Sequence, residues 1–250
     1  MSPLRDLTQS PWDRLSRRVL IAGSPNMGKT TSLLTWPRPL AVVVCPGELG
    51  LTSIPAAPDV DVYTQDVDWS KDVSWQTVVD TFKKDMATAL TDPRYQTVAC
   101  DGLHKAHWAY LNMVNGGAPA RGEKLDARKA YPPTNAKFFG DLRAWLMATT
   151  PNLVFTVWIG RDKQDPDNPE SKSVIFPALP GQAGELVVGE FAVCLHAERE
   201  GTGPAARYIW RTQPNPSVFG VGIKAPPDVA KRIPATVVQD WTKLAAVLTT

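Results

Sequence analysis

A glycine-rich segment between an apolar run and the start of a helix constrains the fold more than any other part of the chain. The apolar run covers residues 18–22, and residues 23–31 read Gly-Ser-Pro-Asn-Met-Gly-Lys-Thr-Thr. This is the pattern G-x-x-x-x-G-K-[ST] in the strand–loop–helix context that a phosphate-binding loop requires. Glycine lets backbone N–H groups approach a phosphate closely, and the N-terminal end of the helix favours the same anion. The segment therefore predicts a loop that binds a nucleoside triphosphate.

The loop also supplies particular chemical groups. We expect Lys29 to reach the β- and γ-phosphates and the hydroxyl of Thr30 to bind Mg²⁺. A chance glycine-rich turn before a helix is the alternative, and the strand and helix that flank the loop disfavour it. The predicted cofactors are ATP and Mg²⁺. The predicted contact residues are Gly23, Ser24, Pro25, Asn26, Met27, Gly28, Lys29, Thr30 and Thr31.

The composition is that of an ordinary globular protein, with 250 residues of which 43% are hydrophobic and 21% charged. A net charge of +2 does not indicate a protein that coats DNA with a basic surface. Cys45, Cys100 and Cys194 lie in separate apolar runs, so we expect reduced core residues. No apolar run is long enough to span a membrane, and the N-terminus lacks a signal-peptide core. We expect a cytoplasmic protein.

Acidic residues follow two of the predicted buried strands. Glu48 comes just after the run at 40–44, and Asp101 ends the run at 97–101. Ligands collect at the carboxyl ends of strands in open α/β sheets, so Glu48 is a candidate to polarise the attacking water. A solvated loop carboxylate is the alternative for Glu48. Asp101 matches a Walker B strand, whose carboxylate helps to hold Mg²⁺, although many buried strands end in Asp.

Two further groups of side chains have competing interpretations. His104 and His107 lie close to Cys100, but no fourth ligand stands nearby, so packed or exposed histidines are favoured over a zinc site. The predicted connection 115–137 holds five basic residues against two acidic ones, together with Tyr131. It is either a solvated surface loop or a contact for single-stranded nucleic acid. The candidate DNA-binding residues are Arg121, Lys124, Arg128 and Lys129.

The remaining elements are expected to alternate between helices and strands before a β-rich end. Helices are predicted over 72–90 with Ser74 as N-cap, after Asp101, and from Thr134 to Pro151. A slightly acidic loop is expected at 160–172, and a turn at 201–204. The predicted later strands cover 152–159, 174–176, 190–197, 207–211 and 217–223, before a last helix through Val238, Trp241, Leu244 and Leu248.

The order of these elements resembles the RecA-like ATPase core. The resemblance implies a mainly parallel central sheet flanked by helices, with an antiparallel β-rich extension, and Glu48 as the catalytic base. In the tail, it rests on the segments 176–181, 190–191 and 222–224, and on Tyr208 before Thr212. These look like the phage-encoded RecA-like ATPases of single-strand annealing.

That family likeness carries further implications. The loops near 115–135 and 160–180 would contact single-stranded DNA, and Lys224 would reach a γ-phosphate, often of a neighbouring subunit. A homo-oligomer, as ring or filament, and a single-strand-binding or replication protein as partner are also implied. Recombinases place a polar sensor, typically Gln, after the strand matched here by 154–159, where this chain has Trp158-Ile159-Gly160.

These observations lead to one functional hypothesis with two alternatives. We expect a single ATPase domain over 1–250, with an irregular lead-in at 1–17, a nucleotide-binding core at 18–160 and a β-rich end with a final helix at 161–250. The expected function is ATP-dependent binding of single-stranded DNA in phage or bacterial recombination. The alternatives are a nucleotide-gated protein-interaction factor such as a helicase loader, and a small-molecule kinase, which the lack of an Arg-x-x-x-Arg lid disfavours.

Overall fold

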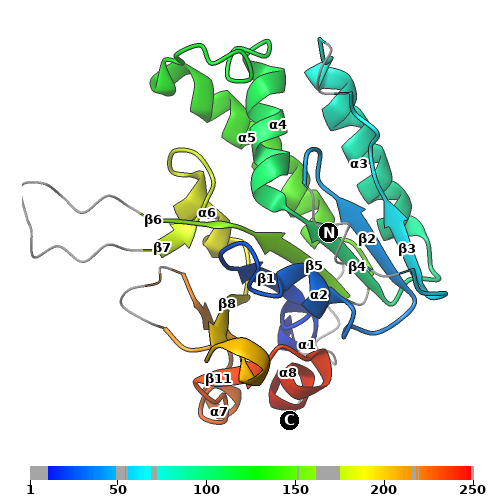
Figure 1. Ribbon diagram of the computed structural model, residues 1–250, viewed down its shortest axis with the longest axis vertical. Helices are drawn as coiled ribbons and strands as arrows, with labels where there is room; N and C mark the ends of the chain where they lie inside the picture. The colour runs from blue at the N-terminus through cyan, green and yellow to red at the C-terminus, as the bar shows by residue number, and fades with distance from the viewer. Residues whose placement is uncertain are drawn as a thin grey trace, which may run out of the picture.

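One large sheet organises the chain in a computed structural model (Figure 1). The structure describes residues 11–48, 54, 56–68, 72–150, 152–161, 175–214, 218 and 220–248. The nine-stranded sheet has the order β11-β9-β8-β1-β5-β4-β2-β3, and β10 pairs with β8. Its strands are β1 (Arg18–Ala22), β2 (Leu40–Val44), β3 (Val60–Tyr63), β4 (Thr97–Asp101), β5 (Asn152–Val157), β8 (Val193–Glu200), β9 (Arg207–Arg211), β10 (Gly222–Ile223) and β11 (Thr236–Val238). A separate pair is formed by β6 (Ile159–Arg161) and β7 (Ile175–Pro177).

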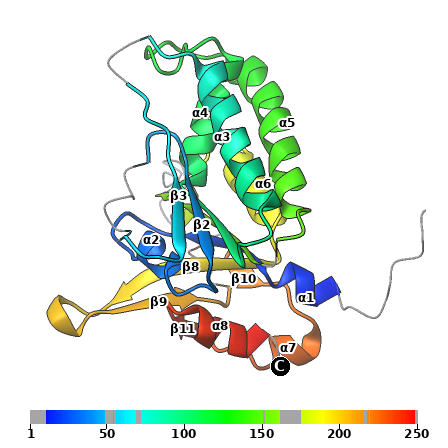
Figure 2. The same ribbon diagram turned by 90° about the vertical axis from the view of Figure 1, so that its right-hand side faces the viewer.

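Helices cover both faces of the large sheet (Figure 2). One core cluster joins the sheet to α3 (Trp75–Thr91), α4 (Leu103–Val114), α5 (Ala127–Leu146) and α6 (Ala183–Gly189). The other joins it to α1 (Pro11–Leu15), α2 (Lys29–Leu33), α7 (Pro227–Ala230) and α8 (Trp241–Leu248). Because both faces are covered, every residue of β1, β2, β4 and β5 is buried, as near-continuous apolar strands of a parallel sheet require.

The strand directions place several loops together. Strands β3, β2, β4, β5, β1 and β8 are parallel neighbours, whereas β9, β10 and β11 pair antiparallel. The carboxyl ends of parallel strands meet at one edge of a sheet. The segments after β1, β2, β4 and β5 therefore converge there. This arrangement is the predicted parallel α/β core with an antiparallel extension.

Several local predictions are confirmed. The strands at 18–22, 40–44, 97–101 and 207–211 have the predicted bounds. Helix α3 follows the N-cap Ser74, whose side chain accepts a hydrogen bond from the Thr77 amide over 3.4 Å. The three cysteines are buried and free, with the sulfur atoms of Cys45 and Cys100 3.4 Å apart. Among the described residues, no helix combines the length and apolar character needed to cross a membrane.

The predicted helix start at Thr134 is wrong. Helix α5 begins at Ala127, and the carboxylate of its N-cap Asp126 accepts a hydrogen bond from the Arg128 amide over 3.1 Å. Pro132 and Pro133 lie inside this helix, where sequence reasoning treated them as loop residues. Packing of α5 against α4 outweighs their missing N–H groups. Arg128 and Lys129 consequently belong to the first turn of a helix, not to a loop.

The C-terminal third also differs from the prediction. The strand predicted at 190–197 starts only at Val193, because Glu190 ends helix α6, which was not predicted. The strand predicted at 217–223 is reduced to Gly222–Ile223 among the described residues. Val238 belongs to β11, so the last helix starts at Trp241. Most of the acidic loop predicted at 160–172 lies outside the described residues, and α1 lies within the lead-in expected to be irregular.

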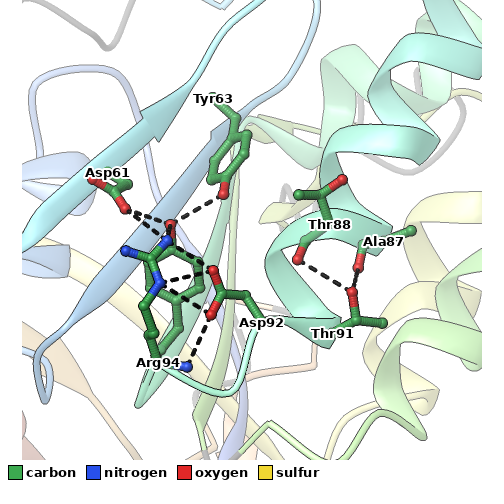
Figure 3. Close-up of polar contacts among 8 residues, drawn as sticks. Asp61, Tyr63, Ala87, Thr88, Thr91, Asp92 and Arg94 are labelled. Carbon is green, nitrogen blue, oxygen red and sulfur yellow. Dashed lines mark hydrogen bonds and ion pairs between the residues drawn. The ribbon is translucent and has the colours of Figure 1, made fainter.

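A polar cluster attaches the edge strand β3 to the turn between α3 and β4 (Figure 3). Tyr95 donates a hydrogen bond to Asp61 on β3, and its hydroxyl lies 3.0 Å from that of Tyr63. Arg94 pairs with Asp92 at 2.7 Å and with Asp61 at 3.7 Å. Burial and the contact with Asp61 raise the pKa of the Tyr95 phenol. The cluster holds β3 in register at the edge of the sheet.

Candidate functional site

The glycines of the phosphate-binding loop are required by close neighbours inside the protein. A Cβ on Gly23 would lie 2.9 Å from the Cβ of Ala197 on β8. Gly28 has φ +76°, and a Cβ there would lie 2.7 Å from Oε1 of Gln239. Real Cβ atoms do not approach other atoms so closely. The loop is therefore fitted against β8 and the C-terminal segment as well as shaped for a ligand.

Lys29 is the first residue of α2, directly after the loop, and is buried. Its Nζ donates hydrogen bonds to the carbonyl oxygens of Gly23 and Ser24, both over 2.8 Å. Burial lowers the pKa of Lys29 to about 8, and the nearby carboxylates of Asp101 and Glu48 oppose that shift. Two neutral carbonyl groups thus hold the ammonium group of Lys29 at the loop. When a nucleotide binds, an anionic phosphate would take their place as the partner of this group.

Asp101 joins the end of β4 to the loop. Its Oδ2 accepts a hydrogen bond from the hydroxyl of Thr30 over 2.9 Å, and its Oδ1 accepts one from Thr156 on β5. Thr156 in turn accepts a hydrogen bond from the amide of Gly102 over 2.9 Å. Burial raises the pKa of the Asp101 carboxyl, and the hydrogen bonds from Thr156 and Thr30 oppose the shift. A hydroxyl and a carboxylate oxygen side by side are the hard donors that suit Mg²⁺.

Glu48 follows the end of β2 and lies close to the turn that follows Asp101. Its side chain is 10% exposed, and its Oε2 lies 3.5 Å from Nε2 of His104. A Cβ on Gly102 would lie 2.7 Å from the same oxygen, so the carboxyl group rests directly on the turn that follows Asp101. The structure therefore brings together Lys29, Thr30, Asp101 and Glu48, which the sequence predicted from separate motifs.

These groups line a pocket of about 720 Å³. Its further wall comes from residues that sequence reasoning did not assign to the site: Trp158 after β5, Tyr208 on β9 and Gln239 after β11. Thr156 was missed as well. The full lining is Pro25, Asn26, Gly28, Lys29, Thr30, Thr31, Ser32, Thr35, Glu48, Asp101, Trp158, Tyr208 and Gln239.

Ser24 and Met27, the remaining side chains of the predicted loop, line a second pocket of about 410 Å³. The other walls of this pocket include His196 and Glu198 of β8. His196 Nδ1 lies 3.0 Å from Glu198, which accepts two hydrogen bonds from Arg211, each over 2.8 Å. The predicted loop therefore contributes side chains to both pockets. The larger one contains the predicted catalytic groups.

The predicted DNA-binding residues belong to the segment between α4 and α5 and to the first turn of α5. Both views show that the turn between these helices lies well away from α2 (Figures 1 and 2). Arg121 is paired with Glu123 at 2.5 Å, and Lys129 lies 3.8 Å from Asp126. Lys124 and Arg128 are exposed and form no ion pair with any residue that the structure describes. None of the four basic residues lines the nucleotide pocket.

Two other predicted contacts are placed away from the pocket. Lys224 donates hydrogen bonds from Nζ to the carbonyl oxygens of Val188 (3.1 Å) and Gly189 (3.4 Å), at the C-terminal end of α6. Within one subunit it is a helix-end contact, and its reach to a neighbouring subunit stays a prediction. The ring of Tyr131 packs against Gly181, where a Cβ would lie 3.2 Å away.

Comparisons with known proteins place the chain in a family. The profile of a family described as an AAA domain matches residues 15–221. No curated protein matches the chain. Among solved structures, an ATPase from the type III secretion system of pathogenic bacteria is 15% identical, with a TM-score of 0.46 over 74% of this chain. A KaiC-like protein from the archaeon Pyrococcus horikoshii is 11% identical, with a TM-score of 0.42 over 78% of each chain.

The assembled ATPase EscN of enteropathogenic E. coli, in complex with its central stalk EscO, is 16% identical with a TM-score of 0.43. That comparison covers 77% of this chain and 45% of EscN. It spans about half (51%) of the first type III secretion ATPase. All three TM-scores lie below 0.5, a degree of likeness from which no activity or partner follows.

Proposed function

Since the chain belongs to the AAA domain family and is a P-loop ATPase, we propose that it hydrolyses Mg²⁺-ATP to control binding to single-stranded DNA in recombination or strand annealing. The observation that carries the proposal is the 2.9 Å hydrogen bond between Thr30 and Asp101, inside a pocket that also contains Lys29 and Glu48. In this proposal residues 1–250 act as one ATPase domain. The proposed location is the cytoplasm, which is that of a bacterial host if the protein is encoded by a phage.

Each residue has a defined task in hydrolysis. Backbone N–H groups of the loop bind the phosphate oxygens, and Lys29 transfers its hydrogen bonds from the loop carbonyls to the γ-phosphoryl group. Thr30 and Asp101 would hold Mg²⁺, which when bound neutralises charge that develops on the phosphates. Glu48 orients the attacking water and accepts its proton.

The DNA-binding part of the proposal is supported by the exposed basic residues at the α4–α5 turn. Lys124 and Arg128 have their charges available for phosphate groups, and a protein that binds phosphates in this way loses affinity as salt rises. We also propose a homo-oligomer, in which Lys224 of one subunit contacts the nucleotide of the next. A single-strand-binding or replication protein is the proposed protein partner.

The test is the rate of ATP hydrolysis with and without single-stranded DNA at two salt concentrations. We expect DNA to stimulate hydrolysis and high salt to remove the stimulation. Lys29→Ala should abolish turnover, and Glu48→Gln should preserve ATP binding while stopping hydrolysis. Turnover that survives Lys29→Ala would contradict the site. A rate of hydrolysis that is the same with and without DNA at both salt concentrations would instead favour the helicase-loader alternative, in which the partner is a protein.

A further inference from the structure

His104 occupies an unusual place beside the catalytic groups. It lies in the first turn of α4, three residues after Asp101, and only 7% of it is exposed. Its Nδ1 lies 3.4 Å from the backbone amide of Trp158, from which it accepts a hydrogen bond. In a neutral imidazole that accepts at Nδ1, the proton resides on Nε2. The Nε2–H group of His104 therefore points away from the backbone amide of Trp158.

The group that faces this N–H is the carboxylate of Glu48. Nε2 of His104 lies 3.5 Å from Oε2 of Glu48, and both side chains are at most 10% exposed. Nε2 has no hydrogen-bond partner at shorter range within the part of the chain described. A buried donor without a close acceptor is costly, so a small approach of Glu48 is favourable.

The imidazole itself is held firmly. Its ring stacks on the indole of Trp158 with 4.4 Å between ring centroids and 25° between planes. Lys105 places its Nζ 5.4 Å above the same indole. Burial and the positive charges of Lys105 and Lys29 lower the pKa of His104 to about 3. His104 is thus a neutral, oriented hydrogen-bond donor at pH 7, and not a cation.

Glu48 needs such support because it does not lie on a regular element. It follows β2 in an irregular segment, and its carboxyl group rests on Gly102. A general base must hold its lone pair within hydrogen-bond reach of the water that it deprotonates. If the Glu48 side chain is already held in that orientation, its rotamer freedom does not have to be given up at each turnover.

We propose that His104 is a positioning residue for hydrolysis, which donates from Nε2 to Oε2 of Glu48 and so directs the other carboxylate oxygen to the attacking water. This inference rests on the proposed ATPase function. It gives Trp158 a task as well: its backbone amide selects the tautomer of His104, and its ring fixes the plane of the imidazole. The residue that stands where recombinases have a polar sensor thus acts through the histidine.

His107 shows that this arrangement is specific to one of the two histidines of α4. It is also buried, and burial lowers its pKa too, but its Nε2 lies 2.9 Å from Asn135 Oδ1 of α5. His107 contacts Phe138 at the helix interface and does not line the pocket. Among the described residues, no group of three or more His, Cys, Asp or Glu side chains is arranged to hold a metal ion.

The experiment compares steady-state ATP turnover in His104→Phe, His104→Leu and His104→Gln with His107→Phe as the matched control. Both apolar variants remove the N–H, and Gln restores a donor. We expect kcat to fall by roughly 10- to 100-fold in the Phe and Leu variants, while KM changes by less than about threefold, because orientation and not binding is lost. His104→Gln should recover most of kcat, and His107→Phe should keep it. Melting curves establish that each variant is folded.

A double mutant completes the test. In a Glu48→Gln background, where turnover is expected to fall to a trace that single-turnover assays measure, adding His104→Phe should reduce that trace no further, since both changes disable one unit. A wild-type kcat in a folded His104→Phe or His104→Leu variant would overturn the inference, as would a His104→Gln variant as slow as the apolar ones. Those results would leave the ATPase assignment intact. That assignment fails separately if the wild-type chain does not hydrolyse ATP or Lys29→Ala still does.

Discussion

The side-chain amide of Gln239 donates a hydrogen bond to the carbonyl oxygen of Met27, 212 positions earlier in the chain, over 2.9 Å. The same Nε2 donates to the carbonyl oxygen of Ile209 on β9 over 3.0 Å. Gln239 is only 8% exposed, and its Oε1 lies against Gly28. The C-terminal segment therefore fixes the backbone of the phosphate-binding loop from outside the parallel core. Trp241 strengthens this attachment by stacking on Trp36 at 3.9 Å.

Replacing Gln239 by Ala should weaken ATP binding. The substitution leaves two carbonyl groups without their donor, at a cost of about 1 kcal/mol each, and lets the loop leave its bound shape. We expect ATP affinity to fall by roughly tenfold, which corresponds to about 1.4 kcal/mol, in a nucleotide titration. Gln213→Ala is the control, because Gln213 donates to the carbonyl of Ile233 over 2.9 Å and does not line the pocket. Equal affinities in both variants would contradict the role of Gln239.

Gly102→Ala should slow turnover without abolishing ATP binding. The added methyl group would lie 2.7 Å from Oε2 of Glu48, so the carboxylate must move. A displacement of that kind is expected to lower kcat by roughly 10- to 100-fold with little change in KM. Gly122→Ala is a matched control, since Gly122 also has positive φ (+75°) but nothing lies within 4 Å of its added Cβ. If both alanine variants lose only stability, Glu48 does not depend on its contact with Gly102.

The parts of the site that the sequence predicted are those carried by local patterns. Lys29 and Thr30 follow from the glycine spacing, and Asp101 and Glu48 from their places after apolar runs. Each of these signals needs only a few neighbouring residues. Because parallel strands end at one edge, predicting the strands was enough to bring the four side chains together.

The parts that were missed depend on contacts between distant segments. Thr156 binds Asp101 only because β5 lies between β1 and β4, an order that no local pattern encodes. Gln239 and Tyr208 reach the loop through antiparallel strands added at the end of the chain. Likewise, the start of α5 at Ala127 reflects packing that overrides Pro132 and Pro133. Such features require the assembled sheet.

Nucleotide affinity should depend on pH through Lys29. Burial lowers its pKa to about 8 without ligand, and a bound phosphate favours the charged form and raises it. Binding ATP above pH 8 therefore requires uptake of a proton, so the Kd rises with pH. From pH 7 to pH 9 we expect a rise of about tenfold, by the linkage of one proton. Lys29→Arg, whose guanidinium stays protonated, should show a flat profile over this range. A wild-type profile as flat as that of Lys29→Arg would contradict a lowered pKa.

Thr156→Val should raise the Mg²⁺ concentration that hydrolysis requires. The hydroxyl of Thr156 donates to Oδ1 of Asp101 and accepts from the amide of Gly102 over 2.9 Å. Valine keeps the shape but leaves a buried carboxylate oxygen and a buried amide without partners, which costs about 1–3 kcal/mol. The pKa of Asp101, already raised by burial, should rise further and oppose the ionised form that would hold the metal in the proposed mechanism. Half-maximal activity in a Mg²⁺ titration should shift upward several-fold, together with a lower melting temperature. Thr156→Ser retains the hydroxyl and should restore the Mg²⁺ dependence, so a serine variant that behaves like valine would assign the effect to packing of the methyl group instead.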